Sequence, residues 1–386
     1  MPVNRIPKPR LKHWFVLNLK GDPYIWMIVI ALACFSSVAV YSATGPLAYI
    51  ARGGNTEYFL FKHLMAVVLG LLSVYLAHKV DFRWYGLISR LVLILSVFLL
   101  LGVYLFGELQ NGATRALSIP LVNLSFQPSD MAKIALIANL ASMLSKRQQD
   151  ISNLSRKVLM PMLIWCGVIC GLIALSDLST AILLLVSCGL LFFIGRVPNR
   201  FFFRLGVVAV IALVAALYFG QRLETAVSRI TSFYEAWGKP ELSSFQNQQS
   251  YVAIASGGII GNQPGQSTQR NFLPQSYSDF IYAIIIEEYG MLGGIAIIFL
   301  YLLLLWRGLL VAAKSEWAFG GLLSAGLSFL IVIQAFMNMG VAVGLLPVTG
   351  LPLPMVSWGG TSLLFTGMAF GIIISVSRGE LMEEEN

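Results

Sequence analysis

Three acidic residues in one stretch of the chain, Asp279, Glu287 and Glu288, are the first candidates for chemistry. The stretch Leu273–Gly290, LPQSYSDFIYAIIIEEYG, begins polar and turns apolar, and both glutamates fall inside the apolar part. A carboxylate in a membrane-like run is costly to bury and usually marks a pathway or a reaction site. In a helix Glu287 lies roughly 12 Å along the axis from Asp279 and points within about 80° of it, whereas Glu288 points away. We therefore expect Asp279 and Glu287 to serve one cavity and Glu288 to need a different partner.

The composition of the chain predicts a membrane protein. Of its 386 residues, 57% are hydrophobic and only 11% are charged, which is too apolar for a soluble protein of this size. The net charge of +8 does not indicate a nucleic-acid partner, because the basic residues are spread over short connections between apolar runs. The four cysteines all fall inside apolar runs, so the sequence indicates neither a disulfide framework nor a cysteine metal site.

Ten apolar segments are expected to be membrane-spanning helices, since a span needs about 20 apolar residues. They are Tyr24–Ala43, Phe61–Ala77, Leu87–Phe106, Met131–Leu144, Val158–Leu175, Leu178–Ile194, Phe201–Phe219, Phe280–Trp306, Phe319–Leu345 and Ser357–Val376. Lys and Arg concentrate in the N-terminal tail and in alternate connections, which places both termini in the cytoplasm. The predicted fold is therefore all-α and polytopic, with about ten transmembrane helices.

The domain organisation follows from these spans. Residues 1–22 form a basic cytoplasmic tail, residues 23–378 a single membrane domain, and residues 379–386 an acidic cytoplasmic tail. A large extracytoplasmic loop, residues 221–279, joins the seventh and eighth spans and is too long to be a simple connection. Apolar residues recur at helical spacing from Ala226 to Trp237 in this loop, which predicts an amphipathic helix on the outer leaflet.

Two segments rich in glycine or proline are expected to shape the outer face. The glycines of SGGIIGNQPGQS, Ser256–Ser267, would let backbone N–H groups approach a phosphate. The segment GLLPVTGLPLPMVSWGG, Gly344–Gly360, cannot be a continuous helix, so it must be a re-entrant or surface loop. Beside catalytic carboxylates, such an apolar loop would suit a groove for a lipid tail.

A sparse set of polar and charged residues lies in the outer segments and the adjoining span ends. It comprises Arg115, Gln127, Asp130, Lys133, Asp177, Gln249, Ser250, Arg270, Asp279 and Glu287. Such a set suits an anionic lipid substrate, with cations holding a pyrophosphate and a carboxylate acting as base or binding a divalent metal. Structural roles are the alternative: Asp130 and Lys133 have the i, i+3 spacing of helix partners, and Asp177 and Asp279 can each cap a helix. The residues alone leave both interpretations of Asp279 open.

Six stretches, in order along most of the chain, carry a resemblance to a known family. They are NGATRALSIP (Asn111–Pro120), FQPSDMAK (Phe126–Lys133), DLSTA (Asp177–Ala181), QQSYVAIASGGIIG (Gln248–Gly261), PQSYSDFIYAIIIEEYG (Pro274–Gly290) and GLLPVTGLPLPMVSWGGTSL (Gly344–Leu363). Together they resemble the signatures of the SEDS family (shape, elongation, division and sporulation), which includes FtsW, RodA and SpoVE. The chain departs from the family where Asp130 replaces the usual Glu, where Ser176 and Ser179 flank Asp177-Leu178 instead of Pro and Gly, and at Asn262–Pro264.

The resemblance implies a peptidoglycan glycosyltransferase of the bacterial plasma membrane, which polymerises lipid II into glycan strands at the outer face and releases undecaprenyl pyrophosphate. It implies that Asp279 is catalytic and takes the proton from the acceptor sugar's 4-hydroxyl. Substrate contacts are expected from Arg115, Lys133, Gln249, Ser250, Arg270 and Glu287. Arg115, Lys133, Arg270 or a divalent cation, Mg or Mn, would meet the pyrophosphate charge, and no other cofactor is implied.

The resemblance also implies partners and leaves alternatives. A class B penicillin-binding protein would crosslink the strands, beside other membrane proteins of the divisome or elongasome. We favour a division role of the FtsW type over an elongation role of the RodA type. A lipid II flippase and a scaffold without chemistry are the alternatives outside this enzyme class.

Overall fold

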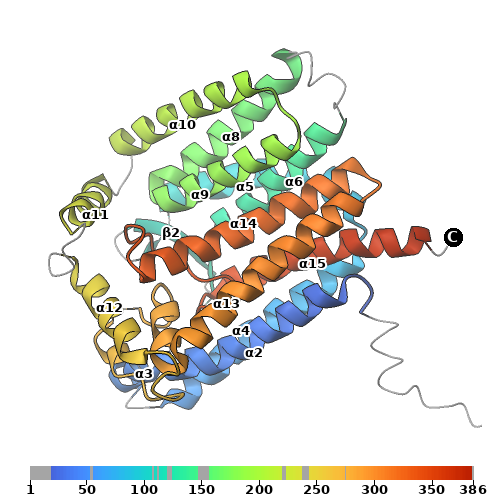
Figure 1. The fold of residues 1–386 in the computed structure, drawn as a ribbon. Coiled ribbons are helices and arrows are strands. Elements are labelled where there is room, and N and C mark those ends of the chain that lie inside the picture. The colour runs from blue at the N-terminus through green and yellow to red at the C-terminus, as the bar shows by residue number, and fades with distance from the viewer. Residues whose placement is uncertain are drawn as a thin grey trace, which may run out of the picture.

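Long apolar helices run alongside one another in the computed structural model (Figure 1). The model describes residues 19–52, 55–106, 108–110, 113–119, 124–146, 156–219, 223–236, 243–273 and 275–384. The helices are α2 (Pro23–Ala43), α3 (Gly45–Arg52), α4 (Thr56–Lys79), α5 (Phe82–Phe106), α6 (Pro128–Lys146), α8 (Arg156–Ser176), α9 (Leu178–Ile194), α10 (Asn199–Phe219), α11 (Leu223–Glu235), α12 (Phe245–Gly257), the 3-10 turn η2 (Gln269–Asn271), α13 (Ile281–Lys314), α14 (Ala318–Ala342) and α15 (Gly360–Glu384).

Each apolar segment predicted to span the membrane contributes a helix. Seven helices of the described chain are long and apolar enough to cross a bilayer: α2, α4, α5, α8 from Leu159, α13, α14, and α15 to Gly379. Helix α9 is apolar but has only 17 residues, and α6 and α10 are not among the seven. The count of ten spans therefore stays a prediction, while the multi-helix architecture is confirmed.

A small antiparallel sheet interrupts the helical pattern, and the all-α prediction omitted it. Its strands are β1 (Glu108–Gln110), β2 (Ala113–Ile119) and β3 (Leu124–Phe126), in the order β1-β2-β3. Proline at position 120 biases the residue before it toward extended backbone, which favours a strand over a helix at this point. Pairing across the sheet then satisfies backbone groups that a helix would have satisfied internally.

Helix α14 lies in the middle of the bundle (Figure 1). In the most apolar 18-residue stretch of α14, 78% of the residues are buried, against 28% in the corresponding stretches of α4, α5 and α13. The other helices therefore pack around α14. Small residues permit this close packing: a Cβ added at Gly326 would meet Ile137 of α6 at 2.7 Å. Polar side chains on α14 are therefore held inside the protein, where they can fix neighbouring segments.

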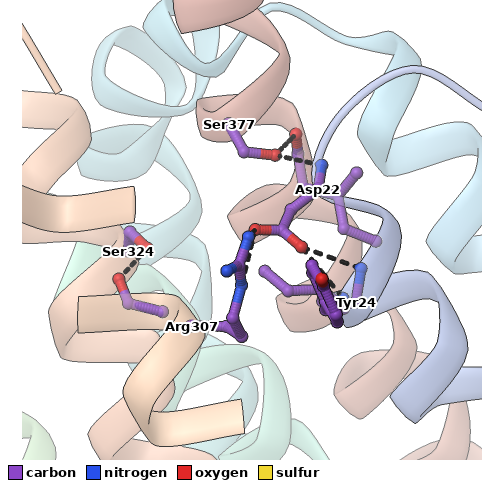
Figure 2. Close-up of polar contacts among 8 residues, drawn as sticks. Asp22, Tyr24, Arg307, Ser324 and Ser377 are labelled. Atoms are coloured by element: carbon purple, nitrogen blue, oxygen red, sulfur yellow. Dashed lines mark hydrogen bonds and ion pairs between the residues drawn. The ribbon is translucent and has the colours of Figure 1, made fainter. Parts of the chain in front are cut away.

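Three helices meet at the ion pair of Asp22 and Arg307 (Figure 2). Asp22 caps α2, because its Oδ1 accepts hydrogen bonds from the backbone N of Tyr24 (2.8 Å) and Ile25 (3.3 Å). Its Oδ2 accepts from Arg307 Nε of α13 at 2.9 Å. The backbone N of Asp22 donates to Ser377 Oγ of α15 at 2.9 Å. The start of α2 and the last part of α15 therefore lie side by side at one end of the bundle.

Replacing Arg307 by Met is expected to lower the free energy of unfolding by about 3–5 kcal/mol, because it leaves the buried Asp22 carboxylate unpaired. Adding Asp22→Asn should recover much of this loss, since the Asn oxygen can still cap α2 and carries no charge. Unfolding of the four proteins of this double-mutant cycle in detergent measures the coupling. Arg204→Met, at an exposed position of α10, is the control and should change stability by no more than about 0.5 kcal/mol. A double variant no more stable than Arg307→Met would contradict the expectation.

Candidate active site

Asp279 lies in the turn that precedes α13. The helix begins at Ile281, and Phe280 occupies the N-cap position without a side-chain capping bond. The Asp279 side chain is partly exposed, and its Oδ1 accepts a hydrogen bond from Ser278 Oγ at 3.0 Å. The N-cap position, which the sequence allowed for Asp279, is thus occupied by Phe280, and the Asp279 carboxylate is left partly exposed.

The turn that carries Asp279 is held by hydrogen bonds that other segments donate to three consecutive backbone carbonyl groups, at residues 277, 278 and 279. Because α13 starts only after them, these carbonyls take no part in the helix and need other donors. The donors come from α14 and from the segment before α15. They are the backbone N of Trp358 to Tyr277 O (2.9 Å), Ser357 Oγ to Ser278 O (2.6 Å) and Asn338 Nδ2 to Asp279 O (2.9 Å). Sequence reasoning missed Asn338 and Ser357, although a polar side chain inside an apolar span was a signal for the first.

The segment 344–359 is irregular, as the sequence predicted, and its part from Leu351 to Ser357 is largely buried. Leu353, Met355 and Val356 have at most 1% of their surface exposed. Its backbone is fixed by two amides one turn apart on α14: Gln334 Nε2 donates to Pro352 O at 2.9 Å and Asn338 Nδ2 to Leu351 O at 2.8 Å. These bonds replace the internal ones that a proline-rich chain cannot make.

Tyr277 provides a neutral neighbour for the Asp279 carboxylate. Burial, and in second place the negative charge of Asp279, raise the pKa of the Tyr277 phenol above its ordinary value. The phenol therefore stays protonated, so it remains available as a hydrogen-bond donor. Its ring packs edge-on against Trp358, with 6.1 Å between ring centroids.

Glu287 is fully buried and binds the loop before the turn. Its Oε1 accepts from the backbone N of Thr268 (2.9 Å) and of Gln269 (3.2 Å) and from Thr268 Oγ1 (3.1 Å), while Ser267 Oγ donates to Oε2. These partners fix the start of η2. Glu287 thus faces the loop Ser267–Gln269, and a direct substrate contact by Glu287 stays a prediction.

Replacing Glu287 by Gln is expected to destabilise this loop by about 1–3 kcal/mol, because an amide nitrogen cannot accept the bonds that one carboxylate oxygen receives. Unfolding in detergent and proteolysis within residues 262–273 measure the effect. Glu316→Gln, a surface position between α13 and α14, is the control. Unchanged stability and unchanged protease resistance in the Glu287 variant would argue against the loop-holding role.

Glu288 has a partner of its own in Ser42, as its position on the helix predicted, but it shares Ser267 with Glu287. Ser42 Oγ of α2 donates to its Oε1, and the backbone N of Ser267 approaches the same oxygen at 3.4 Å. Arg270 joins this network through Ser42, donating from Nη1 to its carbonyl (3.0 Å) and its hydroxyl (2.9 Å). Arg270 and Glu288 therefore fasten the loop at Ser267–Arg270 to α2.

Helix α13 is broken at Gly290, so the predicted single span from Phe280 to Trp306 needs correction. Gly290 has φ 70° and ψ −173°, which lies outside the helical region. The residues before it, 281–288, are all buried, while side chains after it, such as Met291 (55% exposed), face outward. The part from Met291 to Lys314 is about 36 Å long at helical rise, enough to cross a bilayer by itself.

The glycine-rich segment packs on this break. A Cβ at Gly261 would lie 2.3 Å from Glu288 O, and the backbone N of Met291 donates to Gly258 O at 2.9 Å. The close approach of the two backbones therefore explains why residue 261 is a glycine, and a bound phosphate is not needed to explain it. A phosphate-binding role for this loop stays a prediction.

Asp130 and Lys133 are partners on α6, as their spacing predicted. Lys133 Nζ lies 2.8 Å from Asp130 Oδ1 and donates to Gln334 Oε1 at 3.2 Å. Both residues are 6% exposed and border a cavity of about 20 Å³, which has room for about one water molecule. The pair thus links α6 to the amides of α14.

The other predicted site residues lie on separate elements. Ser250 of α12 is buried and donates to Ala342 O of α14 at 2.7 Å, whereas Gln249 is partly buried. Arg115 lies in β2, and its side chain is outside the described residues. The cap expected at Asp177 is confirmed, because its Oδ1 accepts from the backbone N of Thr180 at 3.3 Å at the start of α9.

An apolar pocket of about 430 Å³ lies between α4 and the start of α15. It is lined by Tyr58, Phe61, Lys62, His63, Met65, Ala66, Leu69, Trp358, Gly359, Gly360, Thr361 and Leu364. Trp358 is shared with the Asp279 turn through Tyr277, and it stacks on His63 with 5.6 Å between centroids. Lys62 is the cation among the lining residues. The apolar pocket therefore lies next to the turn that carries Asp279, and Trp358 contacts both.

Metal binding was predicted only as an option. Within the described ranges, no group of three or more His, Cys, Asp or Glu residues is arranged to hold a metal ion. A divalent cation held partly by substrate phosphates stays a prediction.

Comparisons with known proteins agree on the family. The family model for the FtsW/RodA/SpoVE cell cycle proteins matches residues 23–381. The probable peptidoglycan glycosyltransferase FtsW of Geobacter metallireducens is 36% identical over 371 residues, covering 94% of this chain and 97% of that protein. Stage V sporulation protein E of Bacillus subtilis is 32% identical over 364 residues, covering 93% and 98%.

Solved structures share the fold. A chain from a peptidoglycan synthase complex, described as coordinating polymerization and crosslinking, matches with a TM-score of 0.70 and 24% identity, over 93% of this chain and 98% of that one. The family match spans nearly all the described helices and includes Asp279 and the segment that holds it. This protein therefore belongs to the FtsW/RodA/SpoVE family of cell cycle proteins.

Proposed function

We propose that this protein is a peptidoglycan glycosyltransferase that polymerises lipid II into glycan strands during septal wall synthesis. The observation that carries the proposal is a partly exposed carboxylate, Asp279, on a turn fixed at three carbonyls beside an apolar pocket. Relatives that align over nearly their whole length support it, because they are named as probable peptidoglycan glycosyltransferases FtsW. These names favour a division role over an elongation role.

In the reaction, the 4-hydroxyl oxygen of the acceptor sugar attacks the donor's anomeric carbon. Asp279 accepts the hydroxyl proton, the bond from the anomeric carbon to the phosphate oxygen breaks, and undecaprenyl pyrophosphate leaves with the electron pair. The partial exposure of Asp279 supports this role, because the carboxylate must reach the sugar. The protonated phenol of Tyr277 can orient a sugar or phosphate oxygen by donating a hydrogen bond.

The apolar pocket is suited to the substrate's polyprenyl chain. Its lining is mostly aliphatic and aromatic, and Lys62 can meet the pyrophosphate at its edge. Of the cations expected to hold the pyrophosphate, Lys133 is engaged by Asp130 and Gln334, and Arg270 by Ser42. Contacts from Arg115, Gln249 and Ser250, and a Mg or Mn ion on the leaving group, remain part of the proposal.

The protein is a multi-pass protein of the bacterial inner membrane. We propose ten spans within a single domain, residues 23–378, between the cytoplasmic tails 1–22 and 379–386. The adjacency of Asp22 and Ser377 supports placing both ends of the domain on one side of the membrane. Residues 221–279 then lie outside, where lipid II is consumed. A class B penicillin-binding protein is the proposed crosslinking partner.

The test is polymerisation of lipid II by the purified protein in detergent, with and without its class B partner. Glycan strands from the wild type and none from Asp279→Asn support the proposal. Absence of strands from folded wild type with its partner present would overturn it. Translocation of the lipid II headgroup across vesicles by that same protein would then identify a flippase.

A further inference from the structure

We propose that Asn338 is a positioning residue that fixes the Asp279 turn through the Asp279 carbonyl group. The inference rests on the proposed function and deepens it. Asn338 lies in α14, 59 residues from Asp279 along the chain, and only 1% of it is exposed. It touches the backbone of Asp279, so it acts on the carboxylate only by setting where the turn lies.

The Asn338 side-chain amide uses both of its N–H groups as hydrogen-bond donors. One donates to Asp279 O at 2.9 Å and the other to Leu351 O at 2.8 Å, so a single nitrogen ties the catalytic turn to the proline-rich segment. The amide oxygen, Asn338 Oδ1, has no hydrogen-bond partner in the described part of the chain. An amide with only a packing role would pair its oxygen as well as its nitrogen in hydrogen bonds, because an unpaired buried oxygen is costly.

A second contact strengthens the frame. Ser357 Oγ donates to Ser278 O at 2.6 Å and accepts from the backbone N of Leu353 at 2.8 Å. Asn338 and Ser357 therefore bind neighbouring carbonyls of the turn and neighbouring parts of the same buried segment. Hydrogen bonds to two adjacent carbonyl groups restrict both the position and the orientation of the turn. They thereby restrict the direction in which the Asp279 side chain points.

Gln334 supplies a matched control. It lies one turn from Asn338 on the same helix, is 5% exposed, and donates to Pro352 O at 2.9 Å, next to the carbonyl that Asn338 binds. Within the described chain its side-chain hydrogen bonds join Lys133 and Pro352, and none of them reaches the Asp279 turn. A purely structural role for the amides predicts equal effects at the two positions, whereas positioning predicts a larger effect at Asn338.

The experiment compares Asn338→Ala, Ser357→Ala and Gln334→Ala in the full-length protein. Asn338→Ala is expected to lower kcat about 100-fold with KM for lipid II within about twofold, because a displacement of about 1 Å is that costly to a reaction. Gln334→Ala should lower kcat by less than about threefold, and all three should lose similar thermal stability. Equal kcat losses for Asn338→Ala and Gln334→Ala, or a loss confined to KM, would overturn the proposal.

A second readout needs no activity. Hydrogen exchange of the backbone amides of Ser278 and Asp279, both bonded to Gln275 O, should be about tenfold faster in Asn338→Ala and near wild type in Gln334→Ala. Exchange that is the same in both variants overturns the positioning role. If folded wild type makes no polymer, the glycosyltransferase proposal fails, while the exchange comparison still decides whether Asn338 holds the turn. If Asn338→Ala does not fold, Ser357→Ala takes its place in both comparisons.

Discussion

Replacing Asp279 by Asn is expected to lower the rate of glycan polymerisation by about 10²–10⁴-fold, the range for loss of a general base. Asn has the size and shape of Asp and can still accept from Ser278 Oγ, which donates to Asp279 Oδ1 at 3.0 Å. The turn should therefore survive, since its three anchoring bonds are made by backbone carbonyls. The measurement is initial rate at saturating lipid II, with thermal unfolding to show that the fold is intact.

Asp177→Asn is the matched control for this experiment. It makes the same substitution in a buried carboxylate that caps α9, and because Asn caps a helix about as well as Asp, little loss of stability and no loss of rate are expected. A normal rate from Asp279→Asn would remove Asp279 from the chemistry. A similar rate loss in Asp177→Asn would show that the assay responds to stability rather than to the catalytic carboxylate.

Local patterns in the sequence were enough to predict the helices and several side-chain roles. Apolar runs predict the helices because each must satisfy its own backbone in lipid. The i, i+3 spacing of Asp130 and Lys133 predicts an ion pair within one helix, and the structure has it at 2.8 Å. The position of Asp177 at the start of α9 likewise predicts a cap. Each of these inferences depends on residues that are close together along the chain.

Contacts between distant segments could not be predicted in this way. Glu288 binds Ser42, 246 residues away, and Asp279 O is held by Asn338, 59 residues away. No periodicity encodes such pairs, because they depend on which helices become neighbours in the bundle. The sequence singled out Asp279, but the groups that hold its turn in place belong to α14 and to the segment 344–359. The catalytic assignment itself stays a prediction that the first experiment tests.

Replacing Gly290 by Ala is expected to destabilise the protein by more than about 4 kcal/mol, or to prevent folding, because two costs add. The backbone at Gly290, φ 70° and ψ −173°, lies in a region that is essentially restricted to glycine. An added Cβ would also lie 2.2 Å from Ile259 O, a backbone atom that cannot move aside as a side chain can. Yield of folded protein and unfolding in detergent measure the effect.

Gly189→Ala is the control for Gly290→Ala. Gly189 lies inside α9 with open space where its Cβ would be, so alanine there should be neutral or stabilising by up to about 1 kcal/mol. The contrast matters for function, because the break at Gly290 separates the buried helix that follows Asp279 from the part long enough to span the membrane. A folded Gly290→Ala protein of normal stability would show that the break is not required. The position of Asp279 just before α13 would then need another cause.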